Sequence, residues 1–455
     1  MKRFISVLAA LLVVFTISAQ SPEAVLESIR KYPNLAHPVA SPYPSLPLGE
    51  IAKAPKGFKP FYFSLTGRHG SRYELTDKFS KKALTIFDKA AELGILTEDG
   101  KLLHKKIREI VAAQQGNDGE LASLGFKQWR AIAERAYKNF GTIFKSGSVE
   151  ARSSTVSRCV FSMISFSDGL KGVLPSIKIS QNARLADQRI TRPLIHAYNP
   201  DLSKEAYAYI NKQIKMAPWH EARDEWQKRS DFSSFFSKVS TDPEALVTKC
   251  GETSPFTIAN SVFTSVNFAN NFGCGDSELI NRLFTTEELY RFYVVRTSNW
   301  VNGSVGRGND VVEAQVSYMR PLVEDILTKA EAAIKGENPD VANIRFTHDS
   351  YMAPLYSAMG YEGCIPQWNE NLELATTAFN YGTIVPMASN LQIILYRNKK
   401  GEVLVRSLIN ERDGYLPIEC KTAPFYPWEV FCKYVNNSMD DLDKSRDKVL
   451  AKMGK

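Results

Sequence analysis

Two arginines bracket a histidine at the end of an apolar run near the start of the chain. The run Phe61–Leu65 is rich in aromatic residues, and the motif Arg68-His69-Gly70-Ser71-Arg72 follows it closely. Guanidinium groups are planar donors that suit the oxygens of a tetrahedral anion, so the imidazole between them is a candidate nucleophile. Glycine at position 70 removes a Cβ that would keep a ligand from the backbone. The alternative is a solvated basic turn, because so short a motif also arises by chance.

Two later segments repeat this order of strand, charged residue and helix. Residues 149–152 predict a short strand that ends in Arg152, with serine and threonine cap candidates directly after it. Residues 344–347 predict another strand, which ends in His348 and Asp349 and leads into a helix that reaches about residue 360. A helix that begins beside such residues favours a bound anion through its dipole and its free N–H groups.

These strand ends are expected to meet, because ligands of open parallel sheets lie beyond the carboxyl ends of the strands. We therefore expect His69, Arg152 and the pair His348-Asp349 to line one crevice. The alternatives are a surface charge for Arg152, and a helix-capping aspartate beside a core histidine for the pair. Arg158, which lies inside the helix after Arg152, is interpreted as structural.

Regular elements are predicted around these segments. Apolar residues recur at helical spacing after Asp77 as far as Gly94, and again over residues 126–140. Two β runs, 390–397 and 403–409, are joined by the turn 398–401 and predict a hairpin that extends the sheet. The predicted fold is α/β, a three-layer core with a mainly parallel sheet flanked by helices, plus an inserted, mostly helical cap.

The domain organisation follows from where this pattern is interrupted. Residues 20–171 and 340–455 are predicted to form a discontinuous catalytic core, and residues 172–339, which are helical and charged, to form the cap. Within the cap, a glycine-rich loop over 300–308 carries Arg307, a candidate contact with substrate; a solvent-exposed turn is the alternative. This loop lacks the glycine pattern of a dinucleotide-binding or phosphate-binding loop.

Composition excludes several classes of function. The chain has no dense basic block with interleaved aromatics, so no nucleic-acid partner is expected. His220-Glu221 begins like a zinc-protease helix but has no second histidine, and no Gly-x-Ser-x-Gly motif is present. We expect no metal and no cofactor. Without Lys2 and Arg3 the net charge is +6, which suits a small polyanionic ligand.

Residues 1–19 have the layout of a secretory signal peptide: two basic residues, an apolar run and small residues before Gln20. The run is too short to span a membrane, and no transmembrane segment is expected later. The protein is predicted to be exported to a periplasmic, extracellular or other secretory compartment. Six cysteines then allow up to three disulfides, with Cys250–Cys274 and Cys420–Cys432 preferred as nearest neighbours.

The motifs together resemble those of the histidine acid phosphatases, branch 2 of the histidine phosphatase superfamily. The resemblance rests on Arg68–Arg72, on Arg152-Ser153-Ser154 with Arg158, on His348-Asp349, and on the spacing of Leu121, Gly125 and Gln128. The C-terminal residues 382–391, 408–411 and 416–417 are most similar to multiple inositol polyphosphate phosphatases. The resemblance covers about residues 60–170 and 340–432. One departure is His348-Asp349-Ser350, where most inositol polyphosphate phosphatases have His-Ala-Glu.

The resemblance implies a metal-independent phosphomonoester hydrolase that acts through a phosphohistidine. His69 would be the nucleophile and Asp349 the proton donor; Arg68, Arg72, Arg152 and His348 would bind the phosphate. Inositol polyphosphates such as phytate are the implied substrates. The alternatives are an exported acid phosphatase of broad or sugar-phosphate specificity, a phosphotransferase or mutase, and a non-catalytic phosphosugar-binding protein.

Overall fold

The apolar run that precedes the arginine–histidine motif forms the central strand of a sheet that is buried on both faces. In the computed structural model, which describes residues 21–377 and 379–453, this strand is β1 (Lys59–Arg68). Tyr62 packs in one hydrophobic cluster, and Phe63 and Leu65 pack in another. Because alternate side chains of a strand point to opposite faces, both faces must be covered by other elements.

The strand order of the sheet is β3-β2-β4-β1-β5-β6-β7, with β8 paired to β6. The first four strands run parallel, and the later ones pair antiparallel. The α/β prediction is confirmed, and so is the hairpin, which is β5 and β6. The bounds are β2 (Ser148–Ser153), β3 (Ile179–Asn182), β4 (Asp340–Thr347), β5 (Asn390–Arg397), β6 (Val403–Ile409), β7 (Arg412–Gly414) and β8 (Phe425–Pro427).

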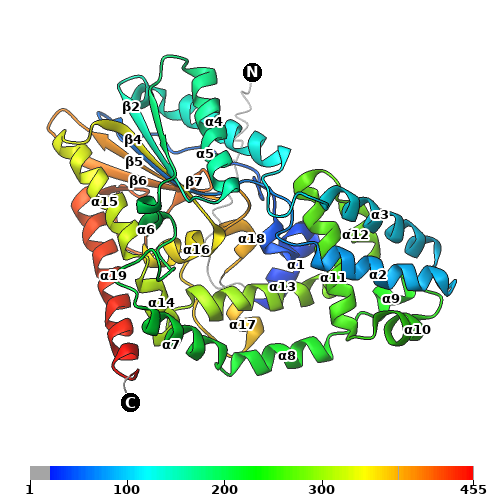
Figure 1. The fold of residues 1–455 in the computed structure, drawn as a ribbon. Helices are drawn as coiled ribbons and strands as arrows, with labels where there is room; N and C mark the ends of the chain where they lie inside the picture. The colour runs from blue at the N-terminus through cyan, green and yellow to red at the C-terminus, as the bar shows by residue number, and fades with distance from the viewer. Residues whose placement is uncertain (1–20, 378, 454–455) are drawn as a thin grey trace, which may run out of the picture.

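Helices cover both faces of the sheet (Figure 1). On one face lie α4 (Ser123–Phe144) and α5 (Ser157–Val173), whose Trp129 and Phe166 pack against Phe346 of β4. On the other face lie α15 (Arg320–Lys335), α16 (Asp349–Ala358) and α19 (Trp428–Leu450), which share a cluster with Tyr62 and Leu395. The predicted three-layer core is therefore present.

A helical lobe lies beside the sheet, on the right of Figure 1. Its hydrophobic core joins α2 (Lys78–Glu92) and α3 (Glu98–Gln114) to α11 (Pro255–Phe268) and α13 (Thr286–Trp300). The predicted domain boundaries stay a prediction, but this packing places α2 and α3, from the first core segment, in the same cluster as cap helices.

The remaining helices are between 3 and 12 residues long. They are α1 (Pro22–Lys31), α6 (Gln188–Thr191), α7 (Lys204–Lys215), α8 (Trp219–Arg229), α9 (Ser233–Val239), α10 (Pro243–Ala245), α12 (Ser277–Leu283), α14 (Asp310–Ser317), α17 (Leu372–Thr377) and α18 (Tyr381–Ile384). Two 3₁₀ turns, η1 (Pro33–Ala36) and η2 (Pro38–Ala40), follow α1.

Two expectations about the whole chain are affected by the structure. All six cysteines are free, so the preferred pairs Cys250–Cys274 and Cys420–Cys432 are not formed. The predicted signal peptide, residues 1–19, lies outside the described residues. Among the helices that are described, none combines the length and the apolar character that a membrane crossing requires.

Candidate active site

The ends of β1 and β4 bring the two predicted histidines together. Arg68 lies opposite Thr347 in the parallel register, and the backbone N–H of His69 donates to the Thr347 carbonyl at 2.9 Å. His348 follows Thr347, and its ring centroid lies 5.6 Å from that of His69. Both histidines are buried. The two strand ends therefore meet at one place, and α16 begins there with Asp349.

Arg68 is wholly buried and makes three polar contacts. Its Nη1 donates to the carbonyl of Val385 at 2.8 Å, and its Nη2 donates to the carbonyl of Val39 at 3.0 Å. The same Nη2 lies 3.0 Å from Oδ2 of Asp349. Two carbonyls and a carboxylate thus fix the orientation of this guanidinium group beside His69.

The contacts of His69 define which of its nitrogens is free to react. Its Nδ1 lies 2.9 Å from the carbonyl oxygen of Gly70. A carbonyl only accepts hydrogen bonds, so Nδ1 carries the proton and Nε2 keeps its lone pair. Burial lowers the pKa of His69 well below its usual value, and the charges of Arg68 and Arg158 lower it further. His69 is therefore a neutral imidazole with an unprotonated Nε2.

A backbone clamp from α4 holds the motif in place. A Cβ on Gly70 would lie 2.7 Å from Cα of Gly125, and a Cβ on Gly125 would overlap the Ser71 carbonyl oxygen. Gly70 thus permits close backbone packing, and its missing Cβ does not open a path to a ligand. The Ser71 N–H donates to Oε1 of Gln128 at 2.8 Å, and Arg72 forms a β-bridge with Leu121. This explains the spacing of Leu121, Gly125 and Gln128.

Arg72 lies on the side of the site that faces the helical lobe. Its Nη1 donates to the carbonyl of Tyr73 at 2.7 Å, and its guanidinium carbon lies 5.1 Å from the ring centroid of Phe268. Burial and the neighbouring charge of Arg68 lower the pKa of Arg72 to about 9, while Asp349 opposes this shift. Arg72 is still cationic at neutral pH, and its positive charge is incompletely compensated.

His348 and Asp349 experience this cationic surrounding in opposite ways. Burial and then the charge of Arg158 lower the pKa of His348 to about 3, so this ring is neutral as well. Burial by itself would raise the pKa of Asp349, but the charges of Arg68 and Arg72 outweigh it and hold the pKa below its usual value. Asp349 therefore lies beside Arg68 as a carboxylate.

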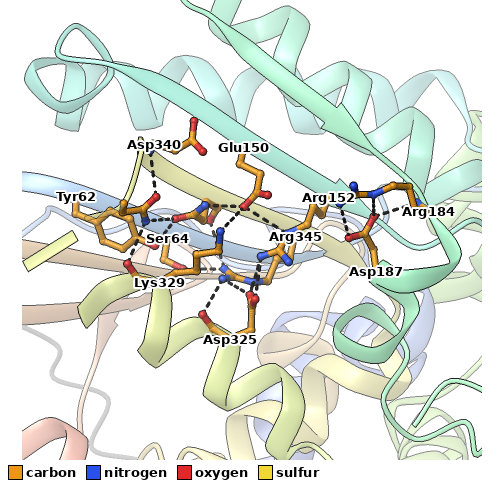
Figure 2. A network of polar contacts seen from close by, with 12 residues as sticks. Tyr62, Ser64, Glu150, Arg152, Arg184, Asp187, Asp325, Lys329, Asp340 and Arg345 are labelled. Carbon is orange, nitrogen blue, oxygen red and sulfur yellow. Dashed lines mark hydrogen bonds and ion pairs between the residues drawn. The ribbon is translucent and has the colours of Figure 1, made fainter. Parts of the chain in front are cut away.

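The structure does not bring Arg152 to the two histidines. Its Nη2 donates to both carboxylate oxygens of Asp325, at 3.0 and 2.8 Å, and Asp325 also pairs with Arg345 (Figure 2). Arg152 lies opposite Arg345 in the β2–β4 register, and Arg345 precedes His348 by three residues. The Arg152 side chain consequently belongs to a charged network next to α15.

Arg158, which the sequence indicated as structural, occupies the place expected for Arg152. The helix α5 begins at Ser157, later than the predicted cap at 153–155, so Arg158 lies in its first turn. Its Nη2 lies 3.4 Å from Nδ1 of His348, and its charge lowers the pKa of both histidines. An arginine in the first turn after a strand end was the available signal.

Besides Arg158, a second arginine near His348, Arg192, was not indicated by any sequence pattern. Arg192, just after α6, contributes to the lowered pKa of His348 and lies with its guanidinium carbon 5.3 Å from the ring centroid of Tyr198. Its Nε has no hydrogen-bond partner among the described residues. Arg192 therefore adds positive charge on the cap side of His348.

Arg307, the predicted cap contact, lies in a different environment. Its Nη2 donates to the carbonyl of Ser357 at 2.9 Å and to Oγ of Ser438 at 3.0 Å. Ser357 belongs to α16 and Ser438 to α19, so Arg307 connects these two helices. No described contact joins it to His69, His348 or Asp349.

Comparisons with known proteins show a family match and similar folds. Residues 66–410 match the family model described as histidine phosphatase superfamily (branch 2). The multiple inositol polyphosphate phosphatase of Bifidobacterium longum, solved with phosphate, is similar at a TM-score of 0.72 and 17% identity, over 88% of this chain and 97% of that one. A phytase from D. castellii is similar at 0.63 and 16%, over 89% and 85%. No curated protein sequence matches the chain.

Proposed function

Because the chain belongs to branch 2 of the histidine phosphatase superfamily, we propose that it hydrolyses phosphomonoesters by passing the phosphoryl group through His69. The observation that carries this proposal is the His69 ring, whose Nδ1 is bound to the Gly70 carbonyl and whose Nε2 is unprotonated, in surroundings where burial and the charges of Arg68 and Arg158 keep the ring neutral. Such an imidazole is a nucleophile at neutral and mildly acidic pH.

The first step is an in-line attack on the phosphorus atom. A bond forms between Nε2 of His69 and phosphorus, the bond from phosphorus to the leaving oxygen breaks, and Asp349 gives a proton to that oxygen. In the second step, water attacks the phosphohistidine, Asp349 accepts the proton of the water, and His69 leaves with its electron pair. The products are an alcohol and inorganic phosphate.

Three arginines stabilise the charge on the phosphoryl oxygens during transfer. They are Arg68, Arg72 and Arg158, and we assign to Arg158 the role that the sequence assigned to Arg152. The contacts of Arg158 with His348, and those of Arg152 with Asp325, support this exchange. Fixed donors of this kind stabilise a developing charge without reorganising. His348 also lines the phosphate site.

Asp349 must be protonated to act as the acid, although Arg68 and Arg72 hold its pKa low. A phosphate dianion between the same arginines neutralises their effect, and its own negative charge raises the pKa of a nearby carboxyl group. Substrate binding therefore supplies the condition under which Asp349 carries a proton. When Asp349 takes up this proton, its ion pair with Arg68 is lost.

Inositol polyphosphates such as phytate are the proposed substrates. The Bifidobacterium longum enzyme has also been solved with inositol hexasulfate. In this chain Arg192 and Arg158 are both cations that act on His348, which suits a polyanionic substrate. The His-Asp pair in place of His-Ala-Glu favours keeping a second candidate, an acid phosphatase of sugar phosphates. We further propose export, from the signal-peptide layout of residues 1–19.

Phosphate release from inositol hexakisphosphate, a sugar phosphate and nitrophenyl phosphate, measured with EDTA present, tests this function. We expect turnover of all three and an acid-labile phosphate on His69 in quenched enzyme. His69→Ala should lose more than a thousandfold in rate, because loss of a nucleophile costs more than one acid–base contribution of about a hundred- to ten-thousandfold. Multiple turnover by His69→Ala above that level contradicts the mechanism.

A further inference from the structure

The segment Pro33–Ser41, here called the strap, lies between the site and the helical lobe. It contains the turns η1 and η2. The carbonyl of Val39 accepts from Nη2 of Arg68 at 3.0 Å. The carbonyl of Ala40 accepts from Nδ2 of Asn271 at 2.8 Å, and Oδ1 of Asn271 accepts from Oγ of Ser71 at 2.7 Å. The strap backbone thus contacts the phosphate-binding motif directly and through one lobe residue.

The side chain of His37 anchors the strap in the lobe. It is buried, and its ring lies 5.7 Å from that of Phe263 and 6.0 Å from that of Phe268. Its Nε2 lies 2.9 Å from Nη1 of Arg296. Because a guanidinium group only donates, Nε2 of His37 is the acceptor and the ring is neutral. This agrees with a pKa lowered by burial and by Arg296.

Arg296 is itself held by a second lobe helix. It belongs to α13, and its Nη2 donates to Oδ1 of Asn260 and to Oγ1 of Thr264, both at 2.6 Å and both on α11. No carboxylate among the described residues lies within ion-pair distance of it; burial lowers its pKa to about 10, and the charge of Glu74 opposes this shift. Burying a charge without an ion pair costs free energy, which the hydrogen bonds of Arg296 to His37, Asn260 and Thr264 offset.

The contacts of Arg296 reach both arginines that flank His69. One path runs through His37 to the strap carbonyl of Val39 and so to Arg68. The other runs through His37 to the Phe268 ring, over which the Arg72 guanidinium lies at 5.1 Å. We propose that Arg296 is a positioning residue for phosphate capture, which acts through His37 on Arg68 and Arg72. The proposal rests on the function proposed above.

The test measures inorganic phosphate binding by calorimetry, together with KM and kcat for nitrophenyl phosphate. Arg296→Met and His37→Phe should each weaken phosphate binding by about tenfold, the low end of a lost charged hydrogen bond. KM should rise by a similar factor, and kcat should change less. Arg296→Lys should recover part of the loss, because an ammonium group can still donate to His37. The double variant should bind no more weakly than Arg296→Met.

Arg282→Gln is the matched control, because Arg282 lies in the same lobe, pairs with Asp99 at the surface and does not contact the strap. It should bind phosphate as the unaltered protein does. Phosphate affinity unchanged in both Arg296→Met and His37→Phe, or losses that add in the double variant, would overturn the inference. An unaltered protein that binds phosphate but never turns over an ester would instead refute only the proposed function.

Discussion

Asp349, which pairs with Arg68, is the proposed proton donor, so the effect of removing it should depend on the leaving group of the substrate. An inositol or sugar alkoxide is a poor leaving group and needs a proton, whereas nitrophenolate leaves without one. Asp349→Asn should therefore slow inositol phosphate hydrolysis by about a hundred- to ten-thousandfold and spare nitrophenyl phosphate far more. Steady-state rates on both esters test this. Equal losses on both, with binding unchanged, would mean that Asp349 positions another group.

Arg158 and Arg152 give a second contrast between single residues. Arg158→Met should reduce kcat/KM by about ten- to a hundredfold, because a charged donor to the phosphate is lost. Arg152→Met should change kcat/KM by less than about threefold and lower the Tm, since Asp325 keeps only Arg345. Steady-state kinetics and thermal unfolding of the two variants test this. A large loss of kcat/KM in Arg152→Met with little loss in Arg158→Met would show that Arg152, and not Arg158, binds the phosphate.

The neutral His348 makes stability depend on pH. Its pKa is about 3 in the folded protein and about 6.5 in an unfolded chain, so between these values the unfolded state binds the extra proton. The free energy of unfolding therefore falls as pH decreases from about 6.5 towards 3, with a slope of about 1.4 kcal/mol per pH unit for one group. In His348→Gln, this slope should be shallower by the contribution of one titrating group, as measured by urea unfolding at several pH values. An unchanged slope would contradict the assignment of the pH dependence to His348.

At the scale of elements, the close approach of α4 to the motif is the most restrictive contact. Gly125→Ala would place a methyl group against the Ser71 carbonyl and push α4 from the motif. We expect about 1–3 kcal/mol of lost stability and reduced phosphate affinity. Gly141→Ala in the same helix is the control, because its Cβ would first meet the Tyr137 ring at 3.4 Å. Similar stability of the two variants would show that the contact between α4 and the Ser71 carbonyl can relax at little cost in free energy.

Strands and helices around the site could be predicted from the sequence, because each strand is a short apolar run that ends in charge. The end of β2 was harder to place. The helix after it begins at Ser157, and the turn between strand and helix moves the site-facing arginine from position 152 to 158. Sequence spacing does not reveal which face of the sheet a strand-end side chain takes. Arg192 and His37 depend on long-range packing, for which local patterns carry no signal.

For the whole molecule, the positive net charge should affect substrate choice. Inositol hexakisphosphate should exceed a monophosphate in kcat/KM at low salt, and the advantage should shrink as salt screens the cations around the site. Lys78 and Lys82 on α2 are candidate contributors, while Lys81 pairs with Asp77 at 2.6 Å. Measuring kcat/KM for both substrates at rising ionic strength tests this. If the ratio of the two values does not change with salt, electrostatic attraction does not determine the selectivity.

The shared core of the helical lobe also limits how this chain can be recombined. Phe87 of α2 and Ile107 of α3 belong to the same cluster as Val262 and Phe263 of α11. A chimera that exchanges only residues 172–339 would place a foreign α11 against native α2 and α3 and would leave mismatched volumes at this junction. Residues 22–36 and 78–114 must accompany the insert, because Val25 and Leu35 belong to the same cluster. The unit that can be transplanted between relatives is thus made of several separate stretches of the gene, although it forms one body of the protein.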